Sequence, residues 1–63
     1  MFLMQRGDEI TLGHGAVRHK LSIKRTDRFS GADIEAVISD MLARFPGEAV
    51  ALARYEARLR AML

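Results

Sequence analysis

The hydrophobic residues of this chain change their spacing near its middle. Up to about residue 25 they alternate with polar residues, the period of a half-buried β-strand, and after residue 30 they recur every three or four positions, the period of an amphipathic helix. The first half predicts strands at about 2–5, 9–12 and 16–24, and the second half predicts helices at about 31–45 and 47–62. The pattern therefore predicts a single small α+β domain over residues 1–63. In this domain an N-terminal antiparallel β-hairpin, or a three-stranded meander if 2–5 joins it, is followed by an αα-hairpin.

The segment 16–24 shows the clearest strand pattern, because its two faces differ in character. One face is apolar apart from a histidine and carries Val17, His19, Leu21 and Ile23. The other face is cationic and carries Arg18, Lys20, Ser22 and Lys24. The preceding Gly13-His14-Gly15 offers glycines with the positive φ that a tight hairpin turn needs. We therefore expect the turn at these residues, with His14 exposed and His19 packed and hydrogen-bonded at the edge of the core.

Signals for two helices follow in the second half of the chain. Ser30 is a good N-cap with Asp33 three residues later, and Arg44 lies near the end of the first helical segment, where a cation complements the helix dipole. Pro46 fits the first turn of a second helix. The apolar stripe of the first helix consists of Ile34, Val37, Ile38, Met41, Leu42 and Phe45. We expect this stripe to form one side of the core.

The second helix carries an apolar stripe of its own, with spacings of three, four and three residues. It consists of Leu52, Tyr55, Leu59 and Met62. One interpretation is that the stripe packs on the first helix and the sheet. The other is that it forms a homodimer interface, since such spacing is also that of a coiled-coil seam. A chain of 63 residues without cysteine has a small core and no disulfides to stabilise it. Small domains of this kind commonly gain stability by self-association. We therefore expect a homo-oligomer.

The sequence contains no set of residues that suits catalysis. The absence of cysteine excludes disulfides and thiolate metal sites. No phosphate-binding loop, nucleophile elbow or HExxH motif occurs. We expect no enzymatic activity, no catalytic residues, no cofactor and no bound metal.

Apolar runs in the chain are short. The opening Met1-Phe2-Leu3-Met4 is shorter than the roughly 7–15 apolar residues of a signal peptide. No run approaches the roughly 20 apolar residues that span a bilayer. We therefore expect a cytoplasmic protein without a membrane partner.

Positive charge is concentrated in the first half of the chain. Residues 1–29 hold six basic and three acidic side chains, whereas residues 30–63 hold four basic and five acidic ones. The candidate binding residues are those of the cationic strand face and its continuation, namely Arg18, Lys20, Ser22, Lys24, Arg25 and Arg28. Such a face can be the solvated side of a sheet, a site for an acidic protein partner, or a site for nucleic acid. Of the two partners, the acidic protein is the favoured one.

A strand followed by two helices resembles the ribbon-helix-helix class of repressors. The resemblance implies a dimeric regulator whose ribbon enters the major groove of DNA. This chain departs from that class because a hairpin's worth of sequence precedes its basic strand and because Pro46-Gly47 is a short connection between helices.

Two functions are consistent with these observations. The leading one is a non-catalytic protein-interaction module, an adaptor, accessory protein or inhibitor that binds a larger macromolecular partner. Proteins of this size are frequent in phages and mobile elements, which fits an inhibitor of host machinery. The alternative is a nucleic-acid-binding regulator that uses the basic strand face.

Overall fold

The computed structural model describes all residues, 1–63, and shows a three-stranded antiparallel sheet followed by two α-helices. The elements are β1 (Phe2–Arg6), β2 (Glu9–His14), β3 (Val17–Ser22), α1 (Gly31–Arg44), the short 3₁₀ turn η1 (Pro46–Glu48) and α2 (Ala49–Arg60). The sheet has the order β1-β2-β3, so both hairpins join neighbouring strands. The predicted α+β fold is confirmed, in its three-stranded form.

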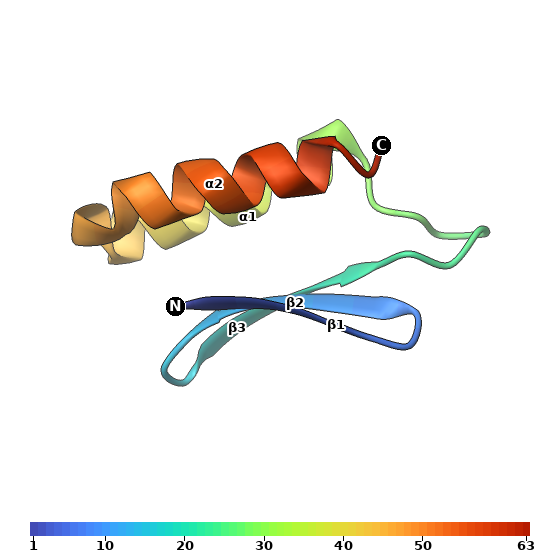
Figure 1. Ribbon diagram of the computed structural model, residues 1–63, viewed down its shortest axis with the longest axis horizontal. Helices are drawn as coiled ribbons and strands as arrows, with labels where there is room; N and C mark the ends of the chain where they lie inside the picture. The colour runs from blue at the N-terminus through green and yellow to red at the C-terminus, as the bar shows by residue number, and fades with distance from the viewer.

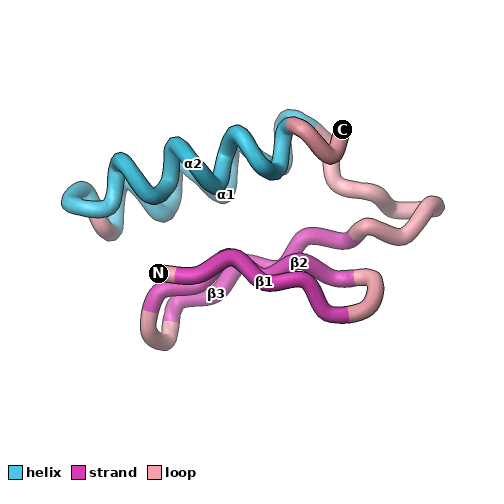
Figure 2. Tube along the Cα trace, viewed as in Figure 1, coloured by secondary structure: helices cyan, strands magenta, loops and turns pink.

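The two helices form one layer and the sheet forms the other (Figure 1). The chain trace in Figure 2 shows the same two layers, with the other face of the sheet left uncovered. The hydroxyl of Tyr55 on α2 donates to the carbonyl of Met1 beside β1 (3.2 Å), and His19 on β3 contacts Asp40 on α1. Helix α2 therefore lies nearer β1, and α1 lies nearer β3.

Both hairpins close through two-residue turns that begin with glycine. Gly7 and Gly15 each have φ of 60°, the conformation that a type II′ turn requires at its first central residue. The second turn comprises Gly15 and Ala16, so the predicted turn at 13–15 is wrong by two residues: Gly13 and His14 belong to β2. Such a turn requires only one glycine, which is Gly15. Gly13 is therefore not needed in the turn and forms part of strand β2.

Strand β3 ends at Ser22, two residues before the predicted end. Beyond it, the N–H of Ile23 donates to the carbonyl of Asp8 (2.8 Å) and the N–H of Phe29 donates to the carbonyl of Ser22 (2.9 Å). The first bond continues the contact with the β1–β2 hairpin by one residue, and the second closes the loop that projects at one end of the molecule in Figure 1.

The core lies between the helices and the inner face of the sheet. Its buried residues are Ile10, Leu12, Leu21, Phe29, Ile34, Val37, Ile38, Met41, Leu52 and Leu59. Four of the six residues in the predicted α1 stripe are buried, whereas Leu42 is 37% exposed and Phe45 is half-buried at the edge. Ser30 caps α1 as predicted, and its side chain and that of Asp33 form a reciprocal capping box.

Candidate binding surface on the open face of the sheet

The uncovered face of the sheet is built by alternate residues of all three strands. Successive side chains of a strand point to opposite faces, and the strand register aligns the outward ones in three rows. These rows are Phe2, Gly13 and Arg18; Met4, Thr11 and Lys20; and Arg6, Glu9 and Ser22. The open face thus has apolar side chains from β1 beside cations from β3.

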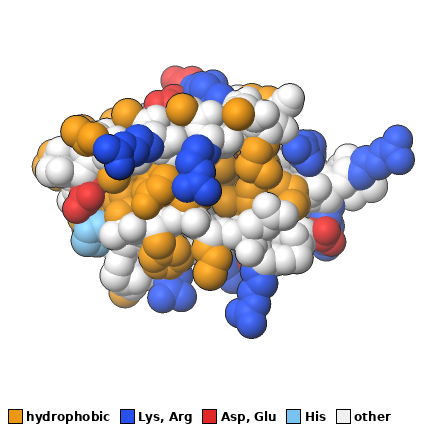
Figure 3. All heavy atoms as spheres, in the orientation of Figure 1, with side chains coloured by type: hydrophobic (Ala, Val, Ile, Leu, Met, Phe, Trp, Pro, Cys, Tyr) orange, Lys and Arg blue, Asp and Glu red, His pale blue; other side chains and the backbone are white.

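Most charged and apolar side chains of this face remain accessible although some of them contact one another, whereas Thr11 in the central row is buried. The Arg18 guanidinium lies 5.6 Å from the centre of the Phe2 ring. Lys20 is 64% exposed, and its Nζ lies 3.7 Å from a carboxylate oxygen of Glu9. Met4 is 47% exposed. In Figure 3, Lys and Arg side chains project on the side below the sheet, with apolar side chains between them.

The structure separates the six predicted binding residues into two groups. Arg18 and Lys20 lie on the open face, two residues apart on β3, together with Ser22. The Ser22 hydroxyl donates to Asp27 Oδ1 (2.8 Å) and accepts from the N–H of Lys24 (3.1 Å). That hydroxyl therefore holds the following loop and is not free for a ligand.

The remaining cations belong to the loop between β3 and α1. Lys24 and Arg25 are exposed there. Arg28 donates from Nη2 to the carbonyl of Met62 (2.6 Å) and also reaches the carbonyl of Ile23 (3.4 Å). Arg28 thus ties the loop to the C-terminal end of the chain, and the structure gives it a structural partner.

Three residues of β1 belong to the open face and were missed in the sequence. They are Phe2, Met4 and Arg6, and each pairs with a β2 residue of the same face. The alternation in residues 2–6 is weak, because Leu3 is the only clearly apolar inward residue beside Gln5. Only the strand register shows that this segment completes the face.

His14 is not the exposed turn residue that its glycine neighbours suggested. Its ring stacks on Phe45 with a centroid distance of 4.2 Å and an interplanar angle of 17°. Its Nε2 lies 3.6 Å from Glu48 Oε1. The prediction was wrong because His14 ends β2 on the inner face, directly below the corner between the helices.

His19 is packed and hydrogen-bonded, as predicted. Its Nε2 donates to Asp40 Oδ2 (2.6 Å), which also accepts from Arg44 Nε (2.9 Å). The hydrogen bond from His19, and after it the one from Arg44, holds the pKa of Asp40 below its ordinary value of 3.8. This network joins β3 to α1 at the edge of the core.

The apolar stripe of α2 faces the chain's own core. Leu52 and Leu59 are fully buried, and Tyr55 and Met62 are half-buried against them. The interpretation that the stripe packs on the chain's own elements is therefore confirmed. Dimerisation through this stripe stays a prediction, and the two interpretations are compatible in an intertwined dimer.

The side chains of the chain do not gather into a metal-binding cluster, since no three histidines or carboxylates lie close enough to share an ion. Neither α-helix has the length and apolar composition needed to cross a membrane.

No family model, curated protein or solved structure matches this chain.

Proposed function

We propose that this chain is a non-catalytic protein-interaction module that binds an acidic surface of a larger macromolecular partner. The observation that carries the proposal is the open face of the sheet, where exposed Met4 on β1 lies across β2 from Arg18 and Lys20 on β3. An adaptor, accessory protein or inhibitor of this size acts by occupying a site on its partner.

The apolar part of the open face favours a protein as partner. Met4 lies in the central row with Thr11 and Lys20, and Phe2 lies in the next row. Protein interfaces typically combine an apolar centre, in which aromatic residues and Met are enriched, with a polar rim. The face combines both kinds of side chain, with Phe2 and Met4 on β1 at one edge and Arg18 and Lys20 on β3 at the other.

The charge of the open face favours an acidic partner. Arg6, Arg18 and Lys20 lie on it, and Glu9 is the one carboxylate among its outward residues. Because both β3 cations are exposed, they can pair with carboxylates of a partner without breaking contacts within the core. Such complementarity contributes chiefly to specificity and to the rate of association.

Reversal of charge on the open face tests this function. The wild-type chain, the double variant Arg18→Glu, Lys20→Glu and a matched loop variant Lys24→Glu, Arg25→Glu are immobilised, and proteins retained from an extract of the source cells are quantified by mass spectrometry. We expect a protein that the wild type and the loop variant retain and the β3 variant loses. Equal retention by all three chains, or loss only in the loop variant, contradicts the proposal.

A nucleic-acid-binding regulator is the second candidate. The observation that favours it is the Arg18 guanidinium above the Phe2 ring on the cationic face of the sheet, since aromatic and cationic groups on sheets bind bases and phosphates. Titration with duplex DNA and RNA at two salt concentrations tests it. A nucleic-acid binder weakens steeply as salt rises, whereas absence of binding at low salt excludes this candidate.

A further inference from the structure

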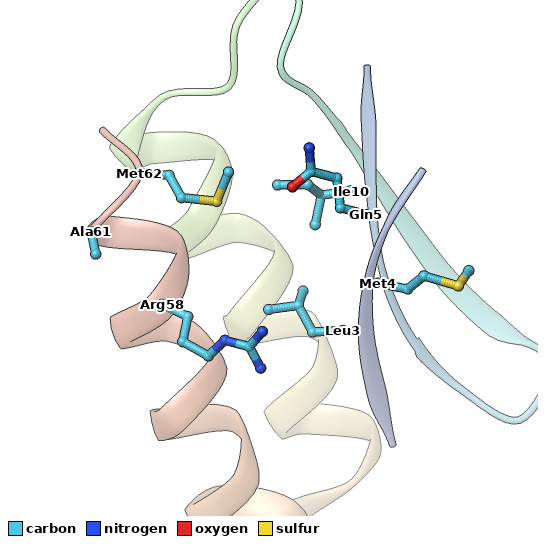
Figure 4. A pocket seen from close by; sticks show the side chains of 7 residues that line it. All are labelled: Leu3, Met4, Gln5, Ile10, Arg58, Ala61 and Met62. Atoms are coloured by element: carbon cyan, nitrogen blue, oxygen red, sulfur yellow. The ribbon is translucent and has the colours of Figure 1, made fainter. Parts of the chain in front are cut away.

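A groove runs between the outer edge of the sheet and the last turns of α2. It has a volume of about 300 Å³ and is lined by Leu3, Met4, Gln5, Ile10, Arg58, Ala61 and Met62. Figure 4 shows Leu3, Gln5 and Ile10 projecting from the sheet toward α2, and the Arg58 side chain extending from α2 toward Leu3. Met4 points to the other side of its strand. The groove is thus mainly apolar with one guanidinium at its wall.

The strand that borders this groove has unpaired backbone groups. Arg6 and Glu9 close the first hairpin as a pair across its two-residue turn, and such a pair exchanges both of its hydrogen bonds. Because bonded and non-bonded pairs alternate, the N–H and C=O of Leu3 and Gln5 point away from β2. No hydrogen bond outside the sheet uses them. Strand β1 therefore offers a free edge alongside the groove.

The two edges of the sheet differ in their protection against further pairing. Charged side chains, Lys above all, commonly guard an edge strand. β3 carries Arg18 and Lys20 within its length, whereas β1 reads Phe-Leu-Met-Gln before its first charge at Arg6. The edge that lies beside the groove is thus the unguarded one.

The charge around the groove defines the ligand further. Arg58 takes part in none of the ion pairs or side-chain hydrogen bonds of the chain. No acidic residue lines the groove, and none lies in β1. A carboxylate is therefore the group that this site lacks and can bind.

We propose that an extended acidic segment of the protein partner pairs with β1 as a fourth strand. Its backbone bonds to the free groups of Leu3 and Gln5, one apolar side chain enters the groove beside Ile10 and Met62, and a neighbouring carboxylate pairs with Arg58. This mode of binding is β-strand addition, in which hydrogen bonds between main chains give affinity and pockets for side chains give specificity. The inference rests on the proposed function and names how the partner is held.

A second copy of the chain fits this edge less well. Pairing of two β1 strands would bring Arg6 and Arg58 of both chains to one interface, and neither β1 nor the groove contains an acid to balance them. Like charges placed together at an interface disfavour association. The acidic segment is therefore the occupant that the charges support.

Selection from a library of random peptides displayed on phage tests the chemistry of the ligand. The full wild-type chain is the bait, and Arg54→Gln is the matched control for Arg58→Gln, since Arg54 is exposed on the same helix but does not line the groove. We expect peptides that alternate apolar and acidic residues. We expect their affinity for the Arg54 variant to equal that for the wild type, and their affinity for the Arg58 variant to be about tenfold lower. Enrichment of basic peptides, no enrichment, or equal loss in both variants overturns the proposal.

N-methylation of the enriched peptide tests strand pairing directly. In a strand paired along one edge, alternate N–H groups face the partner strand. Methylation of one alternate set is therefore expected to abolish binding, and methylation of the other set is expected to leave it unchanged. Equal tolerance of the two sets contradicts strand addition.

Gln5→Pro tests the same edge from the side of the protein. It removes an outward N–H at a place where an edge strand accepts proline, and we expect it to abolish peptide binding. The methylated peptides keep the proposal testable if this variant does not fold.

Sedimentation tests whether a second copy of the chain occupies the edge instead. A wild-type dimer that Gln5→Pro dissociates would assign the edge to a second copy and overturn the proposal.

The two proposals fail in different ways. A partner retained through Arg18 and Lys20, with no acidic strand selected by the groove, overturns strand addition and leaves the proposed function in place. An extract that yields no partner overturns the proposed function, whatever peptide the groove selects.

Discussion

Gly13 lies in the middle of a strand because of the ring that packs on it. A Cβ at this position would lie 2.5 Å from Cζ of Phe2, closer than side-chain carbons approach one another. The Phe2 ring therefore rests on bare backbone, and Arg18 lies on the ring. Glycine weakens a strand interior and often marks such a close approach. The Phe2 ring can pack on the open face in this position only because Gly13 has no side chain.

We predict that Gly13→Ala displaces the Phe2 ring and lowers the free energy of unfolding by about 1–3 kcal/mol, the usual cost of overpacking. In a Phe2→Ala background the same substitution should cost much less, because nothing then opposes the new methyl group. Urea unfolding of the two single variants and the double variant measures this coupling. Equal costs in both backgrounds contradict the packing of Phe2 on Gly13.

The Asp40 network predicts how stability depends on pH. Because the folded chain lowers the pKa of Asp40 below 3.8, with the bond from His19 as the main cause, the carboxylate stabilises the fold at pH values above 3.8. This contribution is lost as the pH falls through the lower pKa of the folded chain. We expect Asp40→Asn to lower the Tm at neutral pH and to have a vanishing effect in strong acid.

Thermal unfolding followed by circular dichroism at neutral and strongly acidic pH measures the Asp40 effect. Ser39→Ala is the control, because Ser39 is exposed on the same helix. A difference in Tm between wild type and Asp40→Asn that stays constant down to strong acid contradicts the role given to the carboxylate.

Sequence patterns predicted single residues well where the relevant neighbours are local. The alternation in 16–24 placed His19 on the inner face. It could not place the Phe45 ring on His14, because 31 positions of chain separate the two residues. Gly13 was assigned to the turn for the same reason, since its true neighbour is Phe2, across the sheet.

At the scale of elements, α1 is the segment whose boundary has the clearest cause. The Ser30 hydroxyl accepts from the N–H of Asp33 (3.2 Å), and Asp33 Oδ2 accepts from the N–H of Ser30 (2.8 Å). Both bonds satisfy donors that a helix start leaves free. At its other end α1 stops at Arg44, immediately before Phe45 and Pro46.

Ser30→Ala should lower the free energy of unfolding by about 1 kcal/mol, because the helix loses its cap. Ser39→Ala, an exposed substitution within α1, should have little effect. Urea unfolding of both variants at neutral pH measures the difference. Equal stabilities would show that the capping box does not stabilise α1.

Element boundaries were predicted best where the side chains set them. Ser30 carries a strong local signal and marks the true start of α1, whereas Pro46 begins the 3₁₀ turn η1. The second helix itself runs from Ala49 to Arg60, two residues shorter at each end than the predicted 47–62. The end of β3 depends on a bond between the N–H of Phe29 and the carbonyl of Ser22, which joins residues that no spacing rule pairs. The predicted strand therefore ran on to Lys24.

At the scale of the whole molecule, one helical layer covers one face of the sheet. A chain of this length has a stability of roughly 3–9 kcal/mol. Leu52 and Leu59 belong to its fully buried side chains. The apolar stripe of α2 thus has a function inside a single chain, and each of its leucines carries a large share of the stability.

We predict that Leu59→Ala lowers the free energy of unfolding by about 2–5 kcal/mol. Val50→Ala, at a position 72% exposed on the same helix, should have almost no effect. Urea unfolding gives both values, and sedimentation of the folded variants gives their mass. A Leu59 variant that is as stable as the wild type but has half its mass would assign this stripe to a dimer interface.

The sequence could not show which surfaces of the whole molecule stay open. Periodicity identified the cationic face of β3 and the core side of α1. The grouping of Met4 with Lys20 requires the register of three strands. The groove beside Arg58 requires the packing of α2 against β1. Neither relation is local, and so the candidate site was predicted only in its β3 part.

The most direct test of the account is a titration of the isotope-labelled chain with the retained partner, followed by amide chemical shifts. We predict that the largest shifts fall on residues 2–6 of β1 and on Arg18 and Lys20 of β3, while the exposed faces of α1 and α2 away from the groove stay unchanged. Shifts confined to those helix faces, or to the loop that carries Lys24 and Arg25, would contradict binding through the open sheet.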